Sequence, residues 1–171
     1  MDIYAFSERM MSMDDDAWAR HAHPFSVWTR VLLGLPVIVL AIWSRAWIGW
    51  WALPAFAGAA FFVWINPRLT PKPKRTDRWS SKVTFGERVF LNRKRIAIPD
   101  GHRRAANILT GVSLFGAPFL IYGLLFLNVW PTLFGSALIY LGKLWFCDRM
   151  VWLYDDMREK NEEYASWLKT G

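Results

Sequence analysis

The chain contains 171 residues, of which 54% are hydrophobic and 20% are charged, and its formal net charge is +7. Ordinary soluble domains are less apolar and more highly charged, and this composition excludes a disordered, collagen-like or coiled-coil protein. The single cysteine, Cys147, cannot form an internal disulfide, so a disulfide-stabilised scaffold is excluded as well.

The first predicted element is a short interfacial helix that ends before Pro24. Ser12 and Asp15 have the spacing of a capping box, and Pro24 disfavours a helical conformation at the residue before it. Trp18 would anchor this helix at a membrane surface. No cleavable signal is apparent, because the N-terminus is acidic and lacks a basic, apolar, small-residue pattern. The alternatives to Met1 as the start are Met10, Met11 and Met13.

Four segments are predicted to cross a membrane as helices, at about residues 27–43, 46–65, 105–127 and 129–147. The second and third segments contain no charged residue. Each is long enough to cross a hydrocarbon core of about 30 Å at a rise of 1.5 Å per residue. The first and fourth segments each hold one basic residue near an end, Arg30 and Lys143, which can reach the interface.

Charge placement predicts the orientation of these spans. Residues 66–104 hold 12 Lys or Arg and 3 acidic residues. The positive-inside rule therefore predicts that this loop and both termini lie in the cytoplasm, in a multi-pass protein of the cell (inner) membrane. Tryptophans fall near both expected interfaces, as two aromatic belts would require. A soluble helical bundle with a tryptophan-rich core is the alternative.

The predicted spans contain no acidic residue, which disfavours a pump or a coupled transporter. Small residues at four-residue spacing would let helices approach closely, either within one four-helix bundle or against a second copy or a partner membrane subunit. An oligomeric pore remains possible. The side chains that could line such a pore are Asn107, Thr110, Ser113, Thr132, Ser136 and Tyr140.

The predicted cytoplasmic face carries the candidate metal-binding and catalytic residues. His21 and His23 precede the first span and, with Asp148, are candidate metal ligands. Glu87, Asp148 and Asp155 are candidates for acid–base catalysis. In the structural alternative, the histidines lie at the interface and the carboxylates form salt bridges with Arg20, Arg30 or Lys143. No motif is specific enough to imply an enzyme or a cofactor.

The basic segment 66–104 is predicted to pack on the membrane face, since a loop of this length without structure would be unusual. Weak alternation predicts a small hairpin that pairs residues 89–91 with 96–98. Basic side chains beside membrane spans attract anionic lipid by about 1 kcal/mol per charge. The predicted lipid-phosphate ligands are Lys72, Lys74, Arg75, Arg78, Lys82, Arg93, Lys94 and Arg95. Too few aromatic residues accompany them to predict nucleic-acid binding.

After the fourth span, the helical pattern is predicted to continue to about Trp167. Four segments of the chain then carry a family resemblance: WARHAHPFSVWTR at 18–30, NPR at 66–68, FGER at 85–88 and GKLWFCDRMVWLYDDM at 142–157. They resemble a family of small prokaryotic membrane proteins that is catalogued as a domain of unknown function. The resemblance covers about residues 13–160. It implies an integral membrane protein and transfers no catalytic residue.

The expected fold is all-α, with residues 1–171 forming one membrane domain of two helical hairpins. A short N-terminal helix precedes the hairpins, and a helical tail at 148–168 extends into the cytoplasm. The leading functional hypothesis is a non-enzymatic accessory, scaffold or lipid-binding subunit. The alternatives are a membrane-interface enzyme or metal-binding protein, and a small oligomeric pore. The expected partners are anionic lipids, with a second copy or another membrane subunit also possible.

Overall fold

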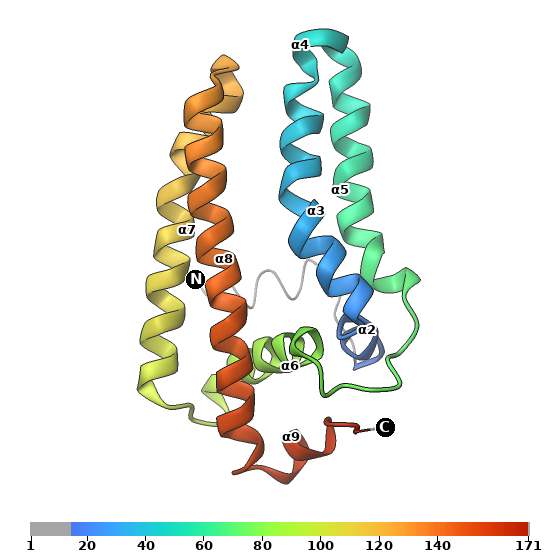
Figure 1. The fold of residues 1–171 in the computed structure, drawn as a ribbon, viewed down its shortest axis with the longest axis vertical. Coiled ribbons are helices and arrows are strands. Elements are labelled where there is room, and N and C mark those ends of the chain that lie inside the picture. Colours follow the sequence, from blue (N-terminus) through green and yellow to red (C-terminus); the bar gives the residue numbers. More distant parts are fainter. Residues whose placement is uncertain (1–14, 171) are drawn as a thin grey trace. The chain divides into compact units, whose positions relative to one another are not determined.

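A computed structural model describes residues 15–170 of the chain, apart from the side chains of Asp15, Asp16 and Pro67. Every regular element in this range is helical (Figure 1), which confirms the all-α prediction. In chain order, the elements are α2 (Asp15–His21), α3 (Pro24–Trp43), α4 (Arg45–Ile48), η1 (Gly49–Trp51), α5 (Ala52–Leu69), α6 (Trp79–Leu91), η2 (Asn92–Lys94), α7 (Asp100–Phe126), α8 (Val129–Arg158) and α9 (Glu162–Ser166). The predicted capping pair Ser12 and Asp15 and the alternative starts Met10, Met11 and Met13 involve parts of the chain outside this description.

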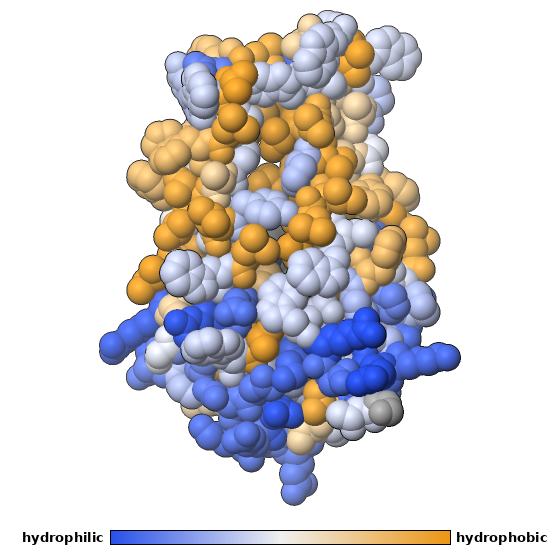
Figure 2. Space-filling model, viewed as in Figure 1, coloured by the Kyte–Doolittle hydropathy of each residue, from blue (hydrophilic) through white to orange (hydrophobic). Residues whose placement is uncertain are grey.

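The described chain divides into two compact units. The polar unit comprises residues 15–28, 64–103 and 147–170, and the apolar unit comprises residues 29–63 and 104–146. All 14 acidic residues of the sequence lie outside the apolar unit. Figure 2 shows mostly hydrophobic side chains over the apolar unit and mostly hydrophilic ones over the polar unit.

Two segments of the chain are long and apolar enough to cross a membrane, Pro24–Asn66 and Asp100–Phe126. The first segment contains α3 and most of α5, and the turn formed by α4 and η1 connects these two helices. Only 17% and 22% of the residues in their most apolar windows are buried. The core helix of a soluble protein would instead be mostly buried.

Helices α7 and α8 approach each other closely in the apolar unit because small residues form their contact. A Cβ atom added to Gly135 would lie 2.4 Å from the backbone nitrogen of Leu120, and one added to Gly116 would lie 2.8 Å from the carbonyl oxygen of Gly135. Any larger side chain would separate the two backbones. The predicted small-residue packing therefore occurs within a single chain.

The C-terminus of α7 is capped by groups distant in the sequence as well as by local ones. Arg45 donates through Nη2 to the carbonyl oxygen of Leu124 at 2.6 Å and also to that of Leu125. Leu127 adopts a φ of 50°, and the N–H of Asn128 reaches the Gly123 carbonyl at 2.8 Å. This is the Schellman arrangement, which glycine favours at the position that Leu127 occupies.

The polar unit has a core of buried aromatic and aliphatic side chains. Helix α6 crosses α8 at Gly86, where an added Cβ would lie 1.9 Å from the carbonyl oxygen of Met150. Around this crossing, Phe90, Leu153 and Tyr154 are almost completely buried. The glycine lets the two backbones touch, so the side chains beside it pack as they do in a soluble domain.

The hairpin predicted for residues 89–98 is wrong. Residues 89–91 form the last part of α6, and Asn92–Lys94 form the 3-10 turn η2. Val83 and Phe90, two turns apart, are both buried on α6. The packing of α6 against α8 therefore determines the helical conformation of residues 89–91. A short apolar–polar alternation is only a weak signal for a strand.

The continuous helix predicted to reach Trp167 is also wrong. Helix α8 ends at Arg158, and a separate helix α9 follows. Asn161 is in an extended conformation, and its side chain accepts a hydrogen bond from the backbone N–H of Tyr164. Asparagine is a strong N-cap residue, and the break lets Tyr164 turn inward and become buried.

Candidate functional site

The two histidines proposed as metal ligands occupy structural positions. His23 immediately precedes α3, and its Nδ1 accepts a hydrogen bond from the Phe25 N–H at 3.3 Å, as an N-cap residue would. The ring of His21 lies edge-on to Trp18, with ring centroids 5.7 Å apart. Its backbone carbonyl also accepts a hydrogen bond from the Thr84 hydroxyl at 3.4 Å.

The candidate carboxylates mainly connect α6 to α8. Asp148 accepts a hydrogen bond from the indole N–H of Trp79 at 3.2 Å. Both carboxylate oxygens of Asp155 lie 2.9 Å from Lys82 Nζ, and one lies 3.0 Å from Arg158 Nε. Lys82 and Arg158 were not among the salt-bridge partners that the sequence suggested. Glu87 lies half-buried on α6.

Among residues 15–170, no group of three or more His, Cys, Asp or Glu side chains is arranged to hold a metal ion. Metal binding by His21, His23 and Asp148 stays a prediction, as does acid–base chemistry by Glu87, Asp148 and Asp155.

Lys82, Arg75 and Arg93 are predicted lipid-phosphate ligands with identified contacts within the protein. Lys82 pairs with Asp155. Arg75 lies 2.7 Å from Asp77 and holds the pKa of that carboxyl below its usual value. Arg93 lies over the Phe90 ring and donates to the Phe90 carbonyl at 2.8 Å. Six of the eight predicted ligands are exposed: Lys72, Lys74, Arg75, Arg78, Lys94 and Arg95.

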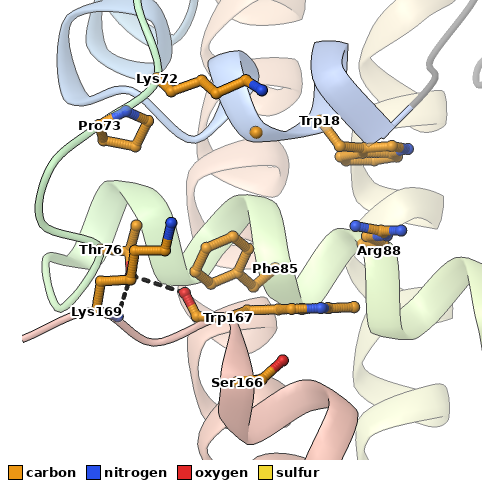
Figure 3. Close-up of a pocket in the computed structure, with 10 residues that line it drawn as sticks. Trp18, Lys72, Pro73, Thr76, Phe85, Arg88, Ser166, Trp167 and Lys169 are labelled. Atoms are coloured by element: carbon orange, nitrogen blue, oxygen red, sulfur yellow. Dashed lines mark hydrogen bonds between the residues drawn. The ribbon is translucent and has the colours of Figure 1, made fainter.

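The polar unit contains a cavity of about 290 Å³ that brings cationic and aromatic side chains together (Figure 3). It is formed by α2, α6, the segment between α5 and α6, and the C-terminal residues from α9 onward. Its lining residues are Trp18, Ala19, Lys72, Pro73, Thr76, Phe85, Arg88, Ser166, Trp167 and Lys169. Among the lining residues in the described part of the chain, three are cationic and none is acidic, so this part of the lining favours an anion.

Aromatic packing holds the cavity wall in place. The Phe85 ring lies 5.7 Å from the Trp167 ring, and the Arg88 guanidinium lies over Trp167 at 4.6 Å from the ring centroid. Figure 3 shows Arg88 between the rings of Trp18 and Trp167. Such a cation–π contact fixes the plane of the guanidinium without neutralising its charge.

Thr76 fastens the C-terminal segment to the other side of the cavity. Its N–H donates to the Lys169 carbonyl at 3.0 Å, and its hydroxyl donates to the Trp167 carbonyl at 2.8 Å. The same hydroxyl accepts a hydrogen bond from the Lys169 N–H at 2.6 Å. Thr76 is itself buried, so these bonds are shielded from water and the segment keeps a defined position.

Sequence reasoning identified Lys72 and the anchoring Trp18 but missed the rest of this cavity. Phe85 and Arg88 carried a usable signal, because residues three apart share a helix face and both belong to the FGER segment. Trp167 and Lys169 carried no such signal in the sequence, because only the break after α8 brings them toward α6.

Among the polar side chains considered for a pore, Ser113, Thr132 and Tyr140 donate hydrogen bonds to backbone carbonyls inside the apolar unit. Ser113 donates to the Leu109 and Ile139 carbonyls, at 3.3 and 3.4 Å. Thr132 donates to the Asn128 carbonyl at 2.8 Å, as expected for a hydroxyl at the start of a helix.

The fold and surface define an all-helical protein with two segments suited to crossing a membrane. A family model matches residues 5–170, and the chain belongs to this family of unknown function, DUF6653. This confirms the resemblance to an uncharacterised family. Comparisons with curated proteins and with solved structures gave no significant match.

Two of the segments that carried the resemblance contact the other two in the polar unit. Ser26, in the first segment, donates a buried hydrogen bond of 3.0 Å to the side-chain oxygen of Asn66, in the second. Gly86, in the third, touches the backbone of Met150, in the fourth. These contacts give all four segments a structural role in the polar unit.

Proposed function

We propose that the protein is a non-enzymatic, four-span subunit of the cell membrane that binds anionic lipid through its polar unit. In this topology, residues 66–104 and both termini are cytoplasmic. The observation that carries the proposal is the charge distribution. Residues 66–104 carry 12 basic and 3 acidic residues, whereas the apolar unit contains no acidic residue. By the positive-inside rule, this contrast favours a cytoplasmic location for residues 66–104. The basic side chains of the segment also attract anionic lipid headgroups.

The exposed side chains of the apolar unit support the membrane-spanning part of the proposal. Large apolar residues on all its long helices are exposed, among them Leu40, Phe61, Ile121 and Leu141. Water would penalise such a surface, whereas lipid tails accommodate it. This exposure includes α8, and it supports spans by all four helices α3, α5, α7 and α8.

Exposed tryptophans support the outer aromatic belt. Trp47, Trp50 and Trp51 lie in the turn between α3 and α5, and Trp130 is the second residue of α8. Between 74% and 86% of each side chain is exposed. Indole rings favour the interface between hydrocarbon and headgroups, so these four positions suit the non-cytoplasmic ends of the two hairpins.

Cysteine labelling tests the proposed topology. In a Cys147→Ala background, Trp50→Cys should react with a membrane-impermeant maleimide in intact cells, and Lys74→Cys should react only after lysis. The opposite pattern would reverse the orientation. Reaction of both positions in intact cells would contradict the single span that the proposal places between them.

Anionic-lipid binding is tested by native mass spectrometry of detergent-purified protein with added phosphatidylglycerol or phosphatidylcholine. Wild-type protein should retain more phosphatidylglycerol than phosphatidylcholine. Lys94→Gln/Arg95→Gln should lower this preference by about 2 kcal/mol, or roughly 30-fold, if each charge contributes about 1 kcal/mol.

The matched control is Lys160→Glu, which removes the same net charge at an exposed position outside residues 66–104. It should keep the preference for phosphatidylglycerol. Equal retention of both lipids by the wild-type protein would refute lipid selectivity.

A further inference from the structure

The cationic cavity of the polar unit has the composition of a ligand site rather than of a general basic surface. Lys72, Arg88 and Lys169 come from three separate parts of the chain and line the same space of about 290 Å³. Figure 3 shows Lys72 on one side of the space, Arg88 on another and Lys169 on a third. Charges that surround one volume act together on an anion placed inside it.

The remaining walls add hydrogen-bonding and apolar surfaces. Trp18 and Phe85 are only 7% and 8% exposed, so their rings form apolar walls. Thr76 and Ser166 contribute hydroxyl groups to the lining. A bare inorganic anion would leave the aromatic surfaces without contacts, whereas an anion with a short carbon portion would use both kinds of wall.

The lining is also largely preformed. Arg88 stacks on Trp167, and the three hydrogen bonds of Thr76 hold Trp167 and Lys169 in place. A site whose donors are already positioned loses less conformational entropy when a ligand binds. The described contacts therefore fix the guanidinium of Arg88 and the backbone of Lys169 before any ligand arrives.

We propose that this cavity binds the phosphate group of a small phosphate ester, with its carbon portion against Trp18 and Phe85. Lysine ammonium and arginine guanidinium groups are the usual side-chain donors to phosphate oxygens. A space of about 290 Å³ accommodates a glycerophosphate-sized group and excludes acyl chains. The ester is either an anionic phospholipid headgroup, in which case the inference rests on the proposed lipid-binding function, or a soluble phosphomonoester.

The experiment uses the full chain in detergent micelles and two probes, glycerol 3-phosphate and phosphatidylglycerol. Binding is measured by native mass spectrometry and, for the soluble probe, by calorimetry. Lys72→Gln/Lys169→Gln is the test variant, because both lysines are exposed and the loss of charge should leave the fold intact. Lys160→Glu removes the same net charge at an exposed position outside the cavity, and unchanged helical circular dichroism verifies folding.

We expect one saturable site per chain, weakened at least tenfold in the test variant and less than twofold in the control. Saturable binding of glycerol 3-phosphate identifies a soluble ester. If only phosphatidylglycerol binds at a single saturable site, the ligand is a headgroup. Arg88→Gln provides a second test, and it should weaken the same site in protein whose circular dichroism remains helical.

Failure of this inference can be distinguished from failure of the lipid-binding proposal. If neither probe shows a site that depends on Lys72 and Lys169, the cavity proposal is overturned, even where Lys94 and Arg95 still confer a preference for phosphatidylglycerol. If glycerol 3-phosphate binds in the cavity but phosphatidylglycerol is not preferred over phosphatidylcholine, the cavity stands and the lipid-binding function fails.

Discussion

The polar and apolar units draw on the same four long helices but pack in different ways. In the polar unit, aromatic rings, methionine and leucine form a buried core, and side-chain hydrogen bonds join segments far apart in sequence. In the apolar unit, glycines bring α7 and α8 together, and the large apolar side chains are exposed. One helix can therefore follow soluble-protein packing at one end and membrane-type packing at the other.

The contrast follows from the surroundings that each unit requires. Water drives apolar side chains into a core, so the polar unit gains stability from burying them. In the proposed topology the apolar unit lies among lipid tails, which provide no such force, so its helices would associate through close backbone approach and satisfied polar groups. Substitutions in the buried core, at a glycine contact or at a helix end can show which kind of packing stabilises each unit.

The largest expected effect comes from Gly86→Ala at the crossing of α6 and α8. The added Cβ would lie 1.9 Å from the Met150 carbonyl oxygen, and a backbone atom cannot move aside cheaply. We expect the free energy of unfolding to fall by about 3 kcal/mol. Thermal unfolding in detergent, followed by circular dichroism, measures the change.

The control for this substitution is Gly101→Ala, at a position with no atom within 4 Å of the added Cβ. It should leave the unfolding midpoint unchanged or slightly higher, because alanine favours helix. A Gly86→Ala protein as stable as Gly101→Ala would contradict the close crossing of α6 and α8.

A second prediction concerns pH and the core of the polar unit. Burial raises the pKa of Tyr154 to about 12 from its ordinary value of 10.0. The unfolded chain therefore releases this proton first, so its contribution to stability is constant below pH 10 and falls as pH rises to 12. The loss reaches about 2 kcal/mol.

Unfolding midpoints at pH 9 and pH 11.5 test this effect. Tyr154→Phe should be less stable at pH 9 by about 1 kcal/mol, since it lacks the 3.0 Å hydrogen bond to the Tyr164 carbonyl. Its further loss between the two pH values should be smaller than that of wild type. Tyr122→Phe, which replaces an exposed ring, should keep the full wild-type dependence.

The apolar unit is tested by Gly135→Ala, whose Cβ would lie 2.4 Å from the backbone nitrogen of Leu120. We expect a loss of about 1–2 kcal/mol, because α7 and α8 must separate. Gly111→Ala lies on α7 with nothing within 4 Å and should have no destabilising effect. Equal midpoints for the two variants would show that glycine contacts do not hold this unit together.

The smallest expected effect is a gain in stability from Leu127→Gly. Leu127 has a φ of 50°, which costs a residue with a Cβ about 1 kcal/mol relative to glycine. The variant should therefore unfold at a slightly higher temperature. Leu125→Gly, within α7, should move the midpoint the other way, by about 1 kcal/mol. A decrease for both variants would argue against the Schellman cap.

Long, uniformly apolar segments were the most predictable part of the fold. Their helical state follows from length and composition, since every backbone group must be paired in an apolar environment. The short helix that ends before Pro24 was also predictable from local sequence. Residues 89–98 were not, because their weak alternation is overridden by the contact of α6 with α8.

The sequence by itself determined the all-helical architecture, the apolar segments, and the separation of acidic residues from them. The order of charged and apolar residue types along the chain is present before folding, so this pattern can be read directly from the sequence. Only the tertiary structure decided the partners of Asp148 and Asp155 and the assembly of Arg88, Trp167 and Lys169 around one cavity. Such contacts join residues far apart in the chain, and they depend on where α8 ends and how closely α6 approaches it.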